Sequence, residues 1–388
     1  MISTFLTAFF YLSVYSIASL IFAAADRAQR MSNQRRYIIM GLAFLSLIAC
    51  FRDTQIGTDT AETISLYFTD QINRTIEFRS ITDFLNSNIL YFIIAKILKS
   101  VHLGEKTFLF LMEFFIVAPI AVCAEKKKDK IPIHITMVLF MLLYYQIGFN
   151  WIRQSIANAF VLLAIVLAEE DKKKKAIVLC IFAVLFHSSA IIGLALFLFT
   201  YAFMHIKNKY ARAFFGIGFI ALFLLLLTNW DRLFALGINY GILPSTYAGY
   251  LRVFTGQTTV SRWFKVGTRT YVDYVWRVLI AILPWVLSFN ETNEFKNKTK
   301  YFKMVAIIGL IIYSFVFFRM HSAYGNRVSY TIEYVQIFTL GMCYRKSNNG
   351  KLVVPVKNIV IIGLAIIYNI WLYYVLGWHD TVPFVFNL

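Results

Sequence analysis

Long apolar runs recur along this chain and decide its class. Hydrophobic residues make up 59% of its 388 residues and charged residues only 15%, and the apolar positions gather mostly in runs of 15 to 22 residues. A helix formed by such a run is long enough to cross a hydrocarbon core of about 30 Å. A membrane β-barrel would instead show alternating segments of about ten residues, and no such segments are visible. We therefore predict an all-α polytopic membrane protein.

Twelve runs are candidate transmembrane helices. They cover residues 4–25, 37–51, 107–124, 132–149, 152–168, 175–187, 188–204, 212–229, 274–290, 302–318, 328–343 and 358–378. One more stretch, residues 84–103, holds only about ten consecutive apolar residues, whereas about 20 are needed to cross. Counting it as a span would place the lysine-rich segment 125–130 outside, against the positive-inside rule. We interpret it as an interfacial or re-entrant helix.

Basic residues divide by type between the two predicted sides of the membrane. The connections predicted to be cytoplasmic hold 17 lysines and 6 arginines, while the rest of the chain holds 4 lysines and 11 arginines. The positive-inside rule places residues 26–36 in the cytoplasm and the N-terminus outside. No basic region precedes the first run, so we expect no cleavable signal. This topology explains the net charge of +18 without a nucleic-acid partner.

We interpret residues 1–388 as a single membrane domain, without internal repeats or a soluble domain. Two predicted outer segments are long enough to hold a site. One is the outer loop 52–103, which includes the interfacial helix, and the other is the large outer loop 230–273. The four cysteines lack metal-ligand spacing, and we expect buried free thiols.

Arginines at the ends of predicted spans are the first functional candidates. A guanidinium group offers a planar fork of donors and keeps its charge when partly dehydrated, which suits a phosphate ligand. An arginine near a helix end can also simply extend to the lipid–water interface, so both interpretations stay open. Burying a charge is costly, and a charge at that depth usually faces a cavity or a partner. Arg52, Arg153, Arg319 and Arg327 are placed in this way.

Candidate acid–base groups are few, and each has a structural alternative. Asp59 lies in the densest outward acid cluster, where it could be a general base or merely the N-cap of a helix. His187 and His321 are lone histidines, and such residues are more often hydrogen-bonded structural groups than catalytic ones. No pair of histidines has metal-ligand spacing. We therefore predict no metal site.

Two further patterns favour structural roles. Arg269, Asp273 and Arg277 recur every four residues, which predicts an ion-pair ladder on one helical face. The outer segment 247–276 is rich in aromatic residues, Tyr250 and Trp263 among them. Such rings would serve as surfaces for sugar stacking, but aromatic belts at membrane interfaces predict much of the same enrichment.

Four short patches together resemble a known family. Their order, spacing and topological placement over residues 40–340 resemble those of the EpsG family of bacterial polysaccharide polymerases, the Wzy-type enzymes. One departure is Thr60, where family members often carry an aromatic residue. The patches are Phe51-Arg52-Asp53 through Ile56-Gly57-Thr58-Asp59, Trp151 through Ala157, Phe186-His187-Ser188-Ser189-Ala190, and Asn326-Arg327-Val328-Ser329-Tyr330 with Tyr334.

The resemblance implies a GT-C-like fold in the bacterial cytoplasmic (inner) membrane and an active site on its outer face. There the enzyme would join oligosaccharide repeat units carried on undecaprenyl diphosphate. It would move the growing chain from its lipid diphosphate to the non-reducing sugar of an incoming unit, without a metal or another cofactor. Its partners would be the lipid-linked oligosaccharide and membrane lipid, with a chain-length regulator and a flippase of the same pathway as further candidates.

The site residues divide into three groups under this resemblance. Arginines would stabilise the departing diphosphate, a base would accept the proton of the acceptor hydroxyl, and aromatic rings would bind sugar. The diphosphate-binding candidates are Arg52, Arg153, Arg252, Arg262, Arg319 and Arg327, the catalytic candidates are Asp59, His187 and His321, and the sugar-binding candidates are Tyr250, Trp263 and Tyr330.

Two other functions stay open. A flippase or transporter of the lipid-linked oligosaccharide would also need an arginine-lined cavity. It should be built from related halves with ionisable groups near the midplane, and the two halves of this chain show no correspondence. An O-antigen ligase, which moves finished glycan to an acceptor such as lipid A core, is disfavoured only by the family patches.

Overall fold

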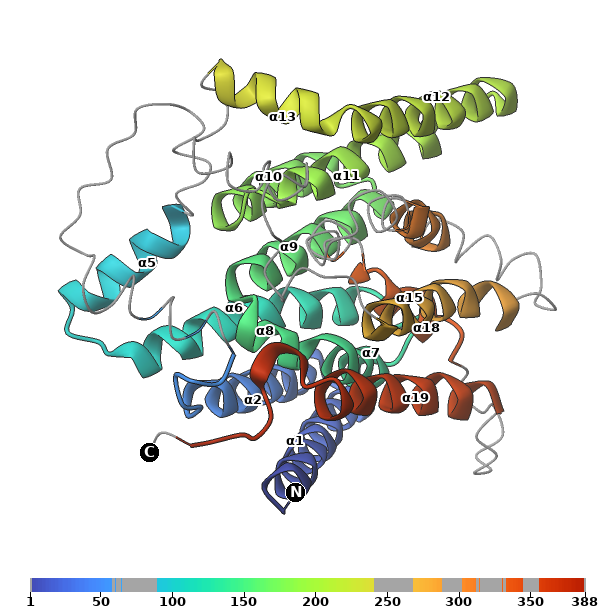
Figure 1. The fold of residues 1–388 in the computed structure, drawn as a ribbon. Coiled ribbons are helices and arrows are strands. Elements are labelled where there is room, and N and C mark those ends of the chain that lie inside the picture. The colour runs from blue at the N-terminus through green and yellow to red at the C-terminus, as the bar shows by residue number, and fades with distance from the viewer. Residues whose placement is uncertain are drawn as a thin grey trace.

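The computed structural model describes most of the chain. The described residues are 2–57, 60, 64, 89–240, 268–287, 302–311, 314, 330, 333–344 and 356–386. Within these ranges every regular element is a helix, and the only other pairing is an isolated β-bridge between Arg52 and Phe386 (Figure 1). The prediction of an all-α protein is confirmed for the described part of the chain.

Most of the helices follow the predicted apolar runs, but one, Trp230–Asn239, lies within the predicted outer loop 230–273. In chain order they are α1 (Ile2–Arg27), α2 (Met31–Cys50), α5 (Ile89–Ser100), α6 (Glu105–Lys126), α7 (Ile133–Phe140), the π-helix η2 (Met141–Tyr145), α8 (Gln146–Asn150), α9 (Ile152–Glu169), α10 (Lys173–Phe186), α11 (Ala190–His205), α12 (Lys209–Thr228), α13 (Trp230–Asn239), α15 (Thr268–Leu287), α18 (Gln336–Gly341), α19 (Val356–Asn369), the π-helix η4 (Ile370–Val375) and the short 3-10 helix η5 (Trp378–Asp380). Residues 302–311 form one more helix.

Five helical stretches among the described residues are long and apolar enough to cross a membrane. They are Ser3–Arg27, Glu105–Lys126, Ile133–Asn150, Ile152–Glu169 and Lys357–Val375. The chain is therefore a helical membrane protein. A total of twelve spans and a GT-C-like fold stay predictions. Helix α5 has 12 residues, about 18 Å of helix, which is too short to cross; its interfacial position also stays a prediction.

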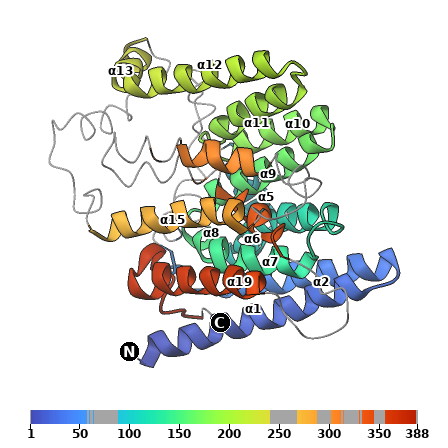
Figure 2. The same ribbon diagram turned by 90° about the vertical axis from the view of Figure 1, so that its right-hand side faces the viewer.

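The helices pack as stacked layers. Helix α9 lies near the centre, where it contacts α6, α10 and α11, and α6 in turn contacts α2. Helix α1 packs on α2 and α7, and α19 packs on η2. Both views place α1 and α12 at opposite ends of the stack (Figure 1 and Figure 2). The segments 133–150 and 152–169 are the most enclosed of the five candidate spans.

Helices α1 and α2 approach each other closely at a glycine. A Cβ atom added at Gly41 would lie 2.5 Å from the ring of Phe22, which is fully buried. Large apolar side chains such as Phe5 and Phe9 lie exposed on α1. Exposed apolar side chains on a membrane helix suit contact with lipid, whereas small residues let two backbones come together.

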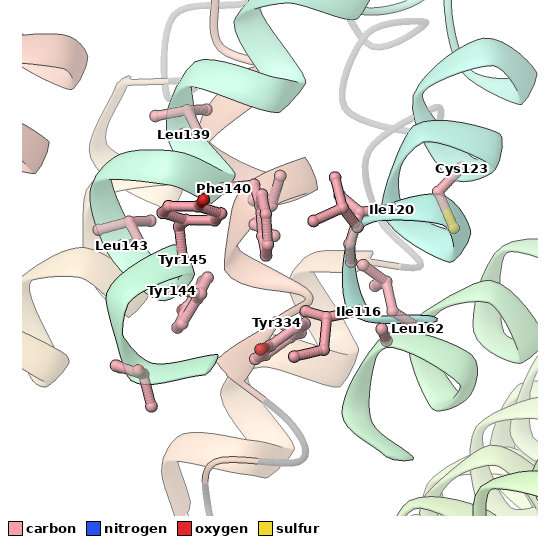
Figure 3. Close-up of a cluster of buried hydrophobic side chains, with 14 of the residues drawn as sticks. Ile116, Ile120, Cys123, Leu139, Phe140, Leu143, Tyr144, Tyr145, Leu162 and Tyr334 are labelled. Carbon is pink, nitrogen blue, oxygen red and sulfur yellow. The ribbon is translucent and has the colours of Figure 1, made fainter. Parts of the chain in front are cut away.

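The core joins four parts of the chain. Figure 3 shows Ile116 and Ile120 of α6 facing Phe140 of α7, with Leu162 of α9 and Tyr334 closing the cluster. The ring of Tyr334 stacks on that of Tyr144, with 4.6 Å between centroids. All four cysteines are free and buried, as the sequence predicted. Dispersion contacts of this kind hold membrane helices together where the hydrophobic effect between them is weak.

One end of the bundle collects lysines and carboxylates, and we call it the lysine end. Lys126 Nζ lies 3.0 Å from Glu170 Oε2, Lys130 Nζ lies 2.7 Å from Glu169 Oε1, and Lys127 pairs with both acids. These contacts join the loop after α6 to the end of α9. Among the described residues, the lysine end contains parts of the predicted cytoplasmic connections, such as residues 26–36 and 125–130.

A buried ion cluster joins α15 to the segment before α18. Arg277 Nε lies 2.7 Å from Asp273 Oδ2, and Arg277 Nη1 also pairs with Glu333 Oε1. Both Asp273 and Arg277 are almost fully buried. The predicted pair between Asp273 and Arg277 is confirmed, while the side chain of Arg269 lies outside the described residues. In a low-dielectric interior, such a cluster is stable only while its charges remain paired.

Replacing Arg277 by Met should destabilise the protein by about 3–5 kcal/mol, because Asp273 and Glu333 would both lose the buried cation that pairs with them. Neutralising all three groups together, as Asp273→Leu, Arg277→Met and Glu333→Leu, should restore most of the loss. Unfolding in detergent micelles measures both, with the exposed position Leu279→Ala as the control. Equal losses in the single and triple variants would contradict this account.

The lysine end should stabilise the fold in a pH-dependent way. Burial opposes ionisation of Glu170, but hydrogen bonds from Lys172 and Lys126 outweigh it and lower the pKa of the carboxyl to about 2. A carboxyl whose pKa falls on folding stabilises the folded state above its unfolded pKa of about 4.3, and this contribution is lost as the pH falls toward 2. The melting temperature of Glu170→Gln should therefore lie below that of the wild type at about pH 6, and the gap should close by about pH 2. A gap that is constant with pH would contradict the assignment.

Candidate functional site

The C-terminal segment folds back over the opposite end of the bundle, which we call the Arg52 end. The backbone N–H of Asp53 donates to Val385 O at 2.8 Å, and that of Gly57 donates to Asp380 O at 3.0 Å. We call residues 377–386 the C-terminal hook. Figure 1 shows this red segment running from α19 past α8 toward the residues that follow α2. The hook thus brings the last residues of the chain onto the loop predicted to hold a site.

Arg52 is fully buried directly after α2. Its side chain is 2% exposed, Nη1 donates to Ala49 O at 3.1 Å, and the guanidinium lies 4.4 Å from the ring centroid of Phe149. Nε has no hydrogen-bond partner among the described residues. A buried guanidinium with an unused donor is costly, which makes Arg52 the strongest arginine candidate in the described structure.

A buried acidic residue of α6 interacts electrostatically with Arg52. Glu113 is 1% exposed, interacts electrostatically with Arg52, and leaves Oε1 without a hydrogen-bond partner in the described part of the chain. A Cβ atom at Gly148 would lie 3.7 Å from Glu113 Oε2, so the carboxylate sits against the backbone of α8. In the sequence, Glu113 is a single acid within the predicted span 107–124.

The loop after Arg52 is pressed onto α8. Gly57 has a φ of +83°, and a Cβ atom there would lie 2.8 Å from the carbonyl carbon of Phe149. Thr60 is fully buried, and its hydroxyl donates to Phe149 O. Thr60 therefore attaches this loop to the end of α8.

The break between α8 and α9 forms the next part of the site. Helix α8 ends at Asn150 and α9 begins at Ile152, and the intervening Trp151 has φ −91° and ψ 54°. The Trp151 ring lies edge-on to His379 of the hook at 4.8 Å and to Tyr330 at 5.1 Å. The Asn150 side chain reaches His379 at 3.1 Å. This break thus joins the hook to the core.

Arg153 stands in the first turn of α9 and is partly exposed. Its guanidinium lies 5.9 Å from the ring centroid of Tyr91 on α5. A cation in the first turn opposes the helix macrodipole, so helix stability does not explain its presence. A guanidinium and a helix N-terminus together favour an anion. This arrangement fits the predicted role in diphosphate binding.

Two other predicted site residues, His187 and Tyr330, make contacts that stabilise the fold. Nδ1 of His187 accepts a hydrogen bond from the Ser189 N–H at 3.2 Å and lies 2.7 Å from Ser189 Oγ, which closes the turn between α10 and α11. Tyr330 is fully buried against Trp151, Tyr144 and Tyr334. A sugar could stack on Tyr330 only after the surrounding side chains moved. Their catalytic and sugar-binding roles stay predictions.

The remaining eight candidates are not among the described residues. Asp59, Tyr250, Arg252, Arg262, Trp263, Arg319, His321 and Arg327 lie outside the described residues. Within the described ranges, no cluster of three or more His, Cys, Asp or Glu residues could hold a metal ion.

His379 is the residue of this site that the sequence analysis missed. It follows the last predicted span in Gly377-Trp378-His379-Asp380, so the predicted topology puts it on the same side as Arg52. The polar and aromatic residues that follow the last predicted span could have indicated a functional segment. The contact between His379 and Asn150 joins residues 229 positions apart, which sequence order alone cannot show.

The fold and this site define a class: an all-α membrane protein whose Arg52 end combines arginines, a helix start and aromatic rings. The model of the EpsG family matches residues 35–386. The chain belongs to the EpsG family. This confirms the resemblance, indicates a Wzy-type polysaccharide polymerase, and includes the C-terminal hook in the family region. Comparisons with curated proteins and with solved structures gave no match.

Replacing Gly57 by Ala should destabilise the protein by at least about 1–2 kcal/mol, because a Cβ atom at positive φ is strained even without a clash. It should also move the loop off Phe149. Gly104→Ala is the matched control, since a Cβ atom there meets nothing within 4 Å. Unfolding in detergent and limited proteolysis of the loop would measure both effects. Equal stability of the two variants would contradict the packing described.

Proposed function

We propose that this protein is a polysaccharide polymerase that forms glycosidic bonds between undecaprenyl-diphosphate-linked oligosaccharide repeat units. The observation that carries the proposal is the EpsG family match over residues 35–386. The geometry of the Arg52 end supports it, because that end gathers the groups that a lipid diphosphate would need. The same proposal includes twelve spans and a GT-C-like fold.

The reaction has one electrostatic difficulty. As the bond between the sugar C1 and the bridging phosphate oxygen breaks, negative charge builds on the departing lipid diphosphate. A preorganised donor in a water-poor site lowers such a barrier by about 3–4 kcal/mol. We assign this role to Arg52 and Arg153, which are anchored on Phe149 and Tyr91. The other proposed donors are Arg252, Arg262, Arg319 and Arg327.

The acceptor half of the reaction needs a base. A new bond joins C1 of the growing chain to the hydroxyl oxygen of the incoming unit, and the hydroxyl proton passes to that base. Asp59, His187 and His321 are the proposed bases. Because Nδ1 of His187 is used within its own turn, only Nε2 of that ring could serve. The proposed mechanism uses no metal or other cofactor, and Tyr250, Trp263 and Tyr330 are the proposed sugar contacts.

The charge distribution supports a site on the outer face. The lysine end carries the ion-paired, lysine-rich connections that the positive-inside rule assigns to the cytoplasm. The Arg52 end is then external, where lipid-linked repeat units are used. We therefore place the protein in the bacterial cytoplasmic membrane. Its proposed partners are the lipid-linked oligosaccharide and membrane lipid, together with a chain-length regulator and a flippase of the same pathway.

The test is direct. Purified protein is incubated with its lipid-linked repeat unit, without added metal or nucleotide sugar, and the products are separated by size. A ladder of products is the expected result. No ladder, with lipid-linked sugar instead crossing the bilayer of reconstituted vesicles, would replace the polymerase with a flippase. Transfer of glycan to lipid A core without a ladder would indicate a ligase.

Arg153→Lys should lower the polymerisation rate by about 100-fold, because lysine cannot offer the planar fork that grips phosphate. Arg36→Lys makes the same change at an exposed position of the lysine end and should leave the rate unchanged. Initial rates of ladder formation measure both. A near-normal rate for Arg153→Lys would mean that this side chain only extends to the membrane interface.

A further inference from the structure

The C-terminal hook holds His379 in a costly backbone conformation. Its φ is +71°, that of Asp380 is +48°, and both lie in the left-handed region. A non-glycine residue in this region costs about 1–2 kcal/mol. Residues kept in such conformations cluster at functional sites, where the surrounding structure over-determines them.

The surroundings of the hook supply that constraint. Besides the hydrogen bond from Gly57, Tyr11 Oη donates to Thr381 O at 3.2 Å, and the Phe384 N–H donates to Thr7 Oγ1 at 3.0 Å. The ring of Phe384 packs on Phe10, 4.6 Å away between centroids. The position of His379 is thus fixed by α1 and by the loop after α2.

The contact with Asn150 sets the tautomer of His379. An amide NH₂ group can only donate, so Asn150 Nδ2 donates to His379 Nδ1 at 3.1 Å. The neutral imidazole then carries its proton on Nε2. The edge-on Trp151 ring fixes the plane of the imidazole, and the side chain remains partly exposed. His379 is therefore oriented as a neutral hydrogen-bond donor through Nε2.

His379 and Arg52 are positioned by adjacent residues. Phe149 lies under the guanidinium of Arg52, and the next residue, Asn150, orients His379. The hook also pairs with Arg52 itself, through the β-bridge to Phe386. A cationic donor and a neutral donor thus contact two consecutive residues at the end of α8.

We propose that His379 is a catalytic residue that donates a hydrogen bond from Nε2 to the departing diphosphate. This assignment rests on the proposed polymerase function. In the step, the bond from sugar C1 to the phosphate oxygen breaks and leaves its electron pair on that oxygen. The bond from C1 to the acceptor oxygen forms, and the acceptor proton passes to the base. His379 keeps its own proton and stabilises the oxyanion alongside Arg52.

Two substitutions separate a donor from a base. His379→Ala should lower kcat by about 100- to 1,000-fold, the usual effect of removing one oxyanion donor. His379→Gln should retain kcat within about tenfold of the wild type, because its amide can accept from Asn150 and donate to the diphosphate. The control is His102→Ala, another histidine at positive φ (56°), which is exposed and should have wild-type rates. Rates and KM come from the product ladder, and melting temperatures are recorded for every variant.

Each outcome decides the assignment. Wild-type rates in His379→Ala, while the wild type forms a ladder, would overturn the role of His379 and leave the polymerase intact. A glutamine variant as inactive as the alanine variant would overturn the donor role, since a base cannot be replaced by an amide. A loss of folded protein that matches the loss of rate would make His379 structural.

If His379→Ala does not fold, His379→Phe keeps a ring against Trp151 without a donor and should show the same loss of kcat. A wild type without any ladder would overturn the polymerase and this assignment together.

Discussion

The cost of burying charge in a membrane protein organises this structure. Arg52, Glu113 and the cluster of Asp273, Arg277 and Glu333 all lie within the bundle, away from water. A low-dielectric interior tolerates such groups only when opposite charges and hydrogen bonds compensate them. The Arg277 cluster is compensated internally, and it acts as a structural joint. Arg52 has unused hydrogen-bonding capacity, and under the proposed function the lipid diphosphate supplies the missing partner.

The chain interrupts its helices where the site is built. The segment 133–150 passes through the π-helix Met141–Tyr145 before it stops at Asn150. Irregular backbone inside a membrane is tolerated only where protein or a polar cavity satisfies it, and π-turns are common at functional sites. Here the break presents the carbonyl of Phe149 to Thr60 and the amide of Asn150 to His379. Local disruption of the helix thus creates the attachment points for the outer loop and the hook.

Distant segments converge on this break. Residues 52–57 and Thr60 follow the end of α2, residues 377–386 follow α19 and η4, and Arg153 lies at the start of α9. An enzyme that acts on a lipid diphosphate needs several donors fixed before the charge develops, because donors that must first reorganise stabilise it less. The EpsG family match includes all three segments.

The sequence by itself determined the class of this protein, the approximate positions of most of its helices and its family. Runs of apolar residues are local and long, so helices such as α6 and α9 could be predicted from hydropathy, and the spacing of Asp273 and Arg277 predicted their ion pair. Arg52, Arg153 and Gly57 were also recognisable, because charge at a span end and glycine before a turn are local signals. Only the tertiary structure showed that buried Glu113 interacts electrostatically with Arg52, that Tyr330 is enclosed, that Thr60 holds a loop against α8, and that His379 contacts Asn150 and Trp151. These facts depend on contacts between residues far apart in the chain, and such contacts follow from how helices pack, which no local pattern encodes.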